Sequence, residues 1–126
     1  MDIEEIIKRT VKQTIMELNE AERKKKPEKS AVEKTIELLN SYNDFKMSTD
    51  PNAQKRLEQI DEALKMIESD PYYQIIPMRY FEKQSIWDIS GFFDVSEKTI
   101  VRHRKALVRR LSCILCTDDV IREILS

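Results

Sequence analysis

The chain has 126 residues, of which 40% are hydrophobic and 36% are charged, with 22 basic and 23 acidic side chains. One glycine and four prolines supply few of the turn residues that a β protein needs, so we expect an all-α fold in one or two small domains. No run approaches the roughly 18 apolar residues of a membrane span, and the start MDIEEII lacks the regions of a signal peptide. We therefore expect a soluble, cytoplasmic protein without membrane contact.

Residues 2 to about 24 have the pattern of an amphipathic helix. One stripe carries Ile3, Ile7, Val11, Ile15 and Leu18, which recur at helical spacing. Such a stripe needs a surface to cover it. Two alternatives stay open: the helix packs on the rest of this chain, or it pairs with a second copy.

Two more helices are predicted before residue 68. Ser30 and Glu33 form a capping box that begins the first of them. Its buried side is expected to hold Val32, Ile36, Leu39 and Phe45, flanked by Leu38 and Tyr42. Asp50 and Pro51 give the start signal of the second helix, with Asp as N-cap and Pro at the first helical position. Its buried positions are expected to be Leu57, Ile60, Leu64 and Ile67.

The same start signal recurs at Asp70-Pro71 and predicts a helix that runs to about Lys83. Its expected core positions are Tyr73, Ile76 and Tyr80. Pro77 removes a backbone donor and clashes with the preceding turn. The helix is therefore either kinked at Pro77 or begins near it.

The next stretch, from Ser85 to Leu111, reads as a short helix, a tight turn and a longer helix. Ile86, Ile89 and Phe93 should face the core from the first helix, and Ile100, Leu107 and Leu111 from the second, which continues to Leu115. Asp94 falls at the turn, where it tolerates a left-handed backbone, and Ser96 is a strong N-cap. Thr117 is the expected N-cap of a last helix, whose apolar residues close the core or form a dimer contact. These residues are Val120, Ile121, Ile124 and Leu125.

The longer helix of this pair carries a charge of one sign. Six basic residues and no acidic one occur between Lys98 and Arg110, which leaves sixteen basic against twenty-three acidic residues in the rest of the chain. A solvated surface helix usually mixes signs to gain pairs three and four residues apart. A single-sign face on the second helix of a helix-turn-helix is typical of contact with double-stranded DNA.

The segment DPYYQIIPMRYFEKQSIWDISGFFDVSEKTIVRHRKALVRRL resembles the region-four helix-turn-helix of bacterial sigma factors. It is more similar still to the sigma-like modules of phage and prophage regulators of the ArpU and RinA type, and VEKTIELLNSYNDFK resembles a segment that precedes the module in them. The resemblance implies N-terminal helices followed by a compact sigma-region-four-like bundle, and a transcriptional regulator of phage or prophage genes. We accordingly divide the chain into an N-terminal helical region for oligomerisation or partner contact, residues 1–68, and a DNA-binding domain, residues 69–126.

By this resemblance the groove-facing positions are Ser96, Glu97, Lys98, Val101, Arg102 and Lys105. Lys98 and Arg102 can donate to guanine edges, whereas Ser96 and Thr99 suit phosphate contacts near a helix N-terminus. Arg104, Arg109 and Arg110 are expected to position the protein on the DNA backbone. Glu97 either accepts from a cytosine amine or favours the helix dipole; we prefer the dipole.

No enzymatic constellation, cofactor or metal site is predicted. Cys113 and Cys116 lack the further ligands of a zinc site, so we interpret them as small apolar core residues. His103 is expected to be a half-buried ring that closes the helix pair, and Trp87 to lie in the core or at its edge. Two other functions stay open, namely a module that docks RNA polymerase, and a phage DNA-packaging or recombination accessory protein. A homodimer is expected, because one short helix-turn-helix buries little surface on DNA.

Overall fold

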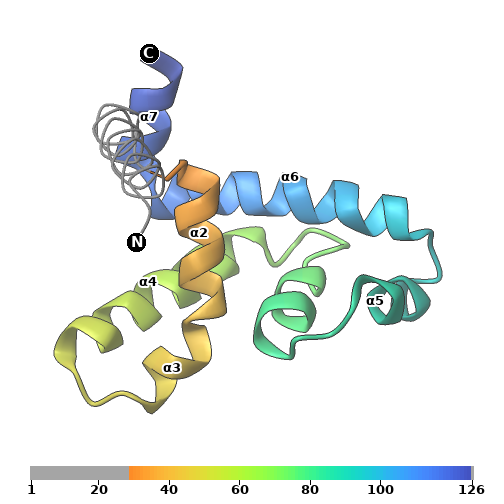
Figure 1. Ribbon diagram of the computed structural model, residues 1–126, viewed down its shortest axis with the longest axis horizontal. Helices are drawn as coiled ribbons and strands as arrows, with labels where there is room; N and C mark the ends of the chain where they lie inside the picture. The colour runs from red at the N-terminus through yellow and green to blue at the C-terminus, as the bar shows by residue number, and fades with distance from the viewer. Residues whose placement is uncertain (1–28, 126) are drawn as a thin grey trace, which may run out of the picture.

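The computed structural model describes residues 29–125, and all regular structure in this range is helical (Figure 1). The elements are α2 (Ala31–Asn40), α3 (Tyr42–Met47), α4 (Pro51–Ile67), the π-helical turn η1 (Pro77–Phe81), α5 (Ile86–Phe93), α6 (Glu97–Leu115) and α7 (Thr117–Leu125). The predicted all-α class is therefore confirmed. The predicted helix over residues 2–24 lies outside the described residues. Within the described range, every helix is too short or too polar to cross a membrane.

Helix α6 is the longest element of the described range and packs against α2, α4, α5 and α7. Figure 1 shows α2 and α4 at its C-terminal half and α5 beside its N-terminal end. The buried residues of α6 follow this arrangement, because only Ile100 belongs to the first two turns and the others cluster further along. These others are Leu107, Val108, Leu111 and Ser112. The N-terminal half of α6 is thus the less covered part of the helix.

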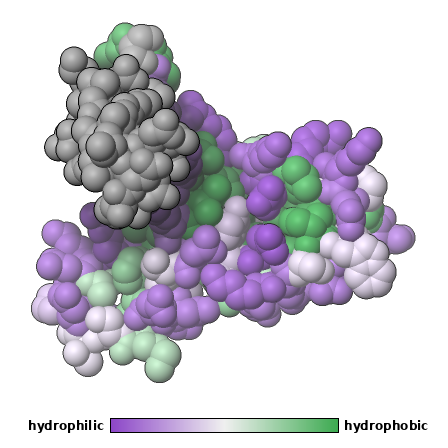
Figure 2. All heavy atoms as spheres, in the orientation of Figure 1, coloured by the Kyte–Doolittle hydropathy of each residue, from purple (hydrophilic) through white to green (hydrophobic). Residues whose placement is uncertain are grey.

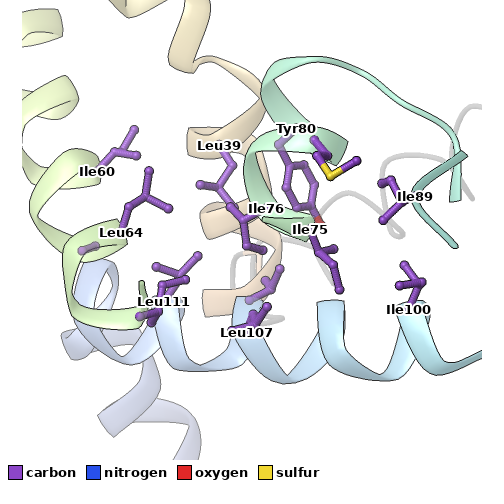
Figure 3. Close-up of a cluster of buried hydrophobic side chains, with 14 residues drawn as sticks. Leu39, Ile60, Leu64, Ile75, Ile76, Tyr80, Ile89, Ile100, Leu107 and Leu111 are labelled. Carbon is purple, nitrogen blue, oxygen red and sulfur yellow. The ribbon is translucent and has the colours of Figure 1, made fainter. Parts of the chain in front are cut away.

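A single hydrophobic cluster connects α2, α4, η1, α5 and α6 (Figure 3). Leu39 of α2 and Ile60 of α4 lie opposite Leu107 and Leu111 of α6, and all four are almost completely buried. Ile89 of α5 extends the cluster toward the N-terminal end of α6. Residues on both sides of the predicted boundary between 68 and 69 thus contribute to one core, so the scaffold of α6 draws on both ranges.

The predicted starts of α2 and α4 are confirmed by their caps. Ser30 Oγ accepts a hydrogen bond from the Glu33 backbone N–H at 3.2 Å. Asp50 Oδ1 accepts one from the Asn52 N–H at 2.9 Å, and Pro51 is the first residue of α4. Each contact satisfies a backbone donor that the first helical turn would leave unpaired.

The buried side of α2 differs from the expectation. Its fully buried positions are Ala31, Thr35 and Leu39, whereas Val32 and Ile36 are only partly buried. Thr35 fits the interior because its hydroxyl donates to the Ala31 carbonyl at 2.8 Å. The sequence pattern missed it because a threonine with a satisfied hydroxyl packs as an apolar residue, a situation that hydropathy alone does not show.

The structure of the segment from Asp70 to Lys83 shows which of the two alternatives for Pro77 holds. Residues 71–74 form turns, and Asp70 Oδ1 caps them by accepting from the Tyr72 N–H at 2.8 Å. Pro77 is the first residue of η1, in which Glu82 N–H donates to the Pro77 carbonyl at 3.0 Å. The proline thus stands at the start of a wider helical turn, where its missing N–H leaves no gap in the hydrogen bonding of that turn.

Thr117 is the first residue of the last helix, α7, and not its N-cap, so its predicted role is wrong. Thr117 Oγ1 donates to the Cys113 carbonyl at 2.6 Å, so it satisfies the end of α6 and does not cap α7. Val120 is buried against Ala31 and Cys116, while Ile121, Ile124 and Leu125 are exposed. Within the described residues, only Val120 of this apolar set closes the core.

Candidate nucleic-acid interface

The turn between α5 and α6 is fixed by a specific backbone arrangement. Asp94 adopts the left-handed conformation, with φ 55° and ψ 47°. The Asp94 N–H donates to the Gly91 carbonyl at 3.3 Å and the Val95 N–H to the Ser90 carbonyl at 3.2 Å, which is the Schellman pattern of a helix end. The predicted role of Asp94 is confirmed. This turn sets the direction in which α6 leaves α5.

The start of α6 is capped by Ser96, as predicted. Its Oγ accepts from the Thr99 N–H at 3.2 Å and lies 2.9 Å from the Thr99 Oγ1. The two hydroxyls that we expected at phosphates therefore already bond to each other. The acid Glu97 follows in the first turn, where a negative charge favours the helix dipole.

Three cations form a stripe along the N-terminal half of α6. Lys98, Arg102 and Lys105 are all exposed, and their spacing of four and three residues places them on one side of the helix. None of them forms an ion pair or hydrogen bond with another residue of the range 29–125. We call these three residues the cationic stripe. It presents positive charge that no described acid neutralises.

An open apolar depression lies within the cationic stripe. Ile86 of α5 and Val101 of α6 contribute its apolar surface, and both are half-buried. Glu97 and the cationic stripe complete its lining. Figure 2 shows hydrophobic atoms bordered by hydrophilic ones at this end of the molecule. Sequence reasoning placed Ile86 in the core, where it does pack, but missed that its side chain also borders α6.

The other three predicted arginines have different surroundings. Arg104 is half-buried, and its Nε is enclosed without a hydrogen-bond partner among the described residues. Arg109 Nη1 lies 3.8 Å from Glu123 Oε2 of α7, and Arg110 Nη1 lies 3.3 Å from Asp70 Oδ2. Ion pairs as exposed as these contribute at most about 1 kcal/mol. The six basic residues therefore divide into an unpaired stripe and a second group that contacts the scaffold.

Aromatic rings attach α6 to the segment before η1. The His103 ring stacks on the Tyr72 ring with centroids 3.8 Å apart, and Tyr72 also contacts Phe93 of α5 at 5.2 Å. His103 is half-buried, as expected, and its partner Tyr72 was not foreseen. This three-ring contact connects both helices of the pair to the same support.

Two aromatic residues of α5 are largely exposed. Trp87 is 73% exposed and Phe92 is 65% exposed, so of the two alternatives for Trp87 the core position is wrong and the edge of the bundle holds. The eight-residue helix buries only Ile89 completely. A ring with one polar atom is often amphipathic in its placement, which fits the exposure of Trp87 beside the buried Ile89.

The cysteine prediction is half right. Cys116 is buried beside Val120, with Thr35 Oγ1 3.6 Å from its sulfur, whereas Cys113 is exposed. Cys113 lies on the outer side of α6, which the core-residue interpretation of both thiols did not allow for. Within residues 29–125, no group of three or more His, Cys, Asp or Glu side chains is arranged to hold a metal ion.

No model of a known protein family, no curated protein and no solved structure matches this chain. The resemblance to sigma-factor region four therefore stays a prediction.

Proposed function

We propose that the protein is a sequence-specific, double-stranded DNA-binding transcriptional regulator, acting on phage or prophage genes, that inserts the N-terminal half of α6 into the major groove. The cationic stripe carries this proposal, because it combines exposure, one sign of charge and the absence of a described ion-pair partner. Duplex DNA offers the matching density of negative charge. The phage assignment rests on the sequence resemblance.

The position of the stripe on α6 fits major-groove reading. In helix-turn-helix proteins the N-terminal residues of the second helix contact base edges, while the first helix crosses the backbone. Here α2 and α4 lie at the other half of α6, so the half with the stripe projects from the scaffold (Figure 1). Arg102 can donate two parallel hydrogen bonds to guanine O6 and N7, and Lys98 can donate to the same atoms.

The second basic group suits a backbone role. Arg109 and Arg110 are held by Glu123 and Asp70, which leaves each side chain about half exposed. A guanidinium held in this way can still donate to a phosphate oxygen through its remaining N–H groups. Such contacts orient the protein on the duplex without reading its sequence.

The proposal is tested by selection of bound duplexes from a random pool with the full chain. We expect a recurring motif, and a dissociation constant whose logarithm rises linearly with log salt, with a slope proportional to the number of phosphates contacted. Enrichment of no motif, together with salt-independent binding, would contradict the proposal. Binding to a packaging-type site with no effect on transcription would instead favour the accessory-protein alternative.

A homodimer is part of this proposal, because two half-sites multiply affinity. The apolar residues Ile121, Ile124 and Leu125 of α7 support it, since no residue of the range 29–125 covers them. Sedimentation equilibrium of the full chain should give the mass of a dimer, and Ile121→Ser with Leu125→Ser should shift it toward the monomer. Met47→Ser is the control, because Met47 is also an exposed apolar residue but lies on α3. A monomer at all concentrations that bind DNA would contradict the dimer.

The exposed rings of α5 favour a second candidate function, docking of RNA polymerase. Trp87 and Phe92 flank Gly91, where an added Cβ would meet no atom within 4 Å. Gly91→Ala should therefore stabilise the folded chain by about 1 kcal/mol, because alanine is the better helix former. If this face contacts polymerase closely, the same change should weaken pull-down of purified polymerase. If the Gly91→Ala and Trp87→Ala variants both pull down polymerase as well as the natural chain does, docking through α5 is contradicted.

A further inference from the structure

We infer that the apolar depression between Ile86 and Val101 receives the 5-methyl group of a thymine, so that the protein reads a T·A pair beside the bases contacted by the cationic stripe. This inference rests on the proposed function and assigns to that site one specific base. The structural relationship that carries it is an open apolar surface bordered by one acid and by three cations that have no ion-pair partner within residues 29–125.

Packing in the described core does not explain why an apolar residue stands at position 101. It is half-buried, yet it is absent from the partly buried hydrophobic residues that pack against either described core cluster. It lies one turn from Lys98 and one turn from Lys105, in the middle of the cationic stripe. A β-branched residue is a poorer helix former than the lysines and arginines around it. A solvated face would be served better by a polar residue at this position.

Ile86 gives the depression a fixed wall. It is the first residue of α5, directly after the cap in which Ser85 Oγ accepts from the Asp88 N–H at 3.1 Å. Its side chain also packs against the main core cluster. A base edge entering the depression would therefore meet one wall from each helix of the pair, with the Ile86 wall held in place by the core.

The charges at the rim distinguish base edges from phosphates. The cationic stripe attracts the duplex, but Glu97 also lines the depression, and its carboxylate would repel a phosphate placed there. Among the four bases only thymine offers a methyl group in the major groove, and the others present polar atoms that an apolar surface leaves unpaired. Thymine is thus the base whose edge matches this lining.

Replacing thymine by deoxyuridine tests the inference, because it removes the methyl group and keeps every hydrogen-bonding atom. We would measure dissociation constants of the full chain for the selected duplex with each thymine replaced in turn. One position in each half-site should lose about fourfold in affinity, which corresponds to burial of one methyl group. The other positions should change little.

Val101→Ala is the matching variant, because it removes apolar surface from the depression and lies outside the core. We expect its thymine-to-deoxyuridine ratio at the sensitive position to fall toward one, with a thermal unfolding temperature no lower than that of the natural chain, because alanine is the better helix former. Lys105→Ala is the control: it should weaken binding to both duplexes alike and keep the fourfold ratio. If Val101→Ala keeps the fourfold thymine-to-deoxyuridine ratio, the assignment of the thymine methyl group to this depression is overturned.

The outcomes separate this inference from the proposed function. Tight, sequence-specific binding in which no deoxyuridine substitution matters, or a selected site without thymine, would overturn the thymine contact and leave DNA binding intact. Absence of any duplex binding at low salt would overturn both.

Discussion

The ring of His103 in α6 stacks on the ring of Tyr72, with centroids 3.8 Å apart and an interplanar angle of 13°. Tyr72 precedes η1, in the turns that Asp70 caps, so the contact joins α6 to a segment about thirty residues earlier. It lies one residue from Arg102 of the cationic stripe. An aromatic contact therefore holds this part of α6, which carries the candidate interface, against the segment before η1.

Loss of this stacking should destabilise the fold. A double-mutant cycle with Tyr72→Leu and His103→Leu should give a coupling energy of about 0.5–1.5 kcal/mol, the usual value for an aromatic pair, from urea unfolding followed by circular dichroism. His103→Phe keeps a flat ring and is expected to retain most of the stability. Additive effects of the two leucine changes would show that the rings are neighbours without interaction.

The left-handed backbone at Asp94 should determine which substitutions the turn tolerates. Its φ of 55° strains any residue with a Cβ, and aspartate tolerates this better than alanine does. Asp94→Gly should therefore be at least as stable as the natural chain, and Asp94→Ala about 1 kcal/mol less stable than Asp94→Gly. Lys83, with φ 57°, provides the same comparison at a second site outside the helix pair. Equal stability of the alanine and glycine variants at both sites would contradict the strain.

The free energy of unfolding should depend on pH at high pH because of Tyr42. Burial raises its pKa from 10.0 to about 12, and the hydrogen bond that its hydroxyl donates to Asp61 at 2.7 Å acts in the same direction. Between these two pH values the unfolded chain loses the Tyr42 proton while the folded chain keeps it. The contribution of Tyr42 to the free energy of unfolding is therefore complete below pH 10 and is lost as the pH rises toward 12.

Comparison with Tyr42→Phe isolates this contribution from the titration of lysines and other tyrosines. The difference in unfolding free energy between the two proteins should be constant up to pH 9 to 10 and shrink above it. Chemical denaturation at several pH values measures it. Parallel curves for the two proteins throughout this range would refute the raised pKa of Tyr42.

Arg102 and Arg109 should affect DNA binding differently. Arg102→Ala should weaken binding to the selected duplex by about 1–3 kcal/mol and relax the preference at one base position, because a bidentate guanine contact is lost. Arg109→Ala should weaken selected and random duplexes alike. Arg56→Ala, which removes an exposed arginine from α4, is the matched control. Equal losses on both duplexes for Arg102→Ala would place Arg102 at the backbone.

The regular parts of this fold could be predicted from the sequence because each has its own local signal. Asp50-Pro51, Ser85 and Ser96 are caps with known geometry, and all three stand where the sequence placed them. Ile60, Leu64 and Ile67 share a helical stripe and are buried. Where a short-range rule decides the structure, the sequence is sufficient.

Other features depend on the partner segment and could not be predicted. Tyr72 stacks on His103 and Thr35 is buried near Cys116 because distant segments meet there. Trp87 is exposed because α5 is covered on only one side, which its own sequence does not show. That Arg109 and Arg110 are paired within the described range, while the cationic stripe is not, likewise depends on where Glu123 and Asp70 lie in space.

The salt dependence of duplex binding tests the central role of the cationic stripe most directly. Three proteins are compared: the natural chain, the triple variant Lys98→Ala, Arg102→Ala and Lys105→Ala, and a control with Lys55→Ala, Arg56→Ala and Lys65→Ala, which removes the same charges from exposed positions of α4. Removing the stripe should make the plot of log affinity against log salt less steep, by at most about 2.7, because cations that lie in the groove neutralise nearby phosphates and each neutralised phosphate contributes about 0.9. The control should keep the slope of the natural chain. Identical slopes for all three proteins would contradict contact between this stripe and DNA.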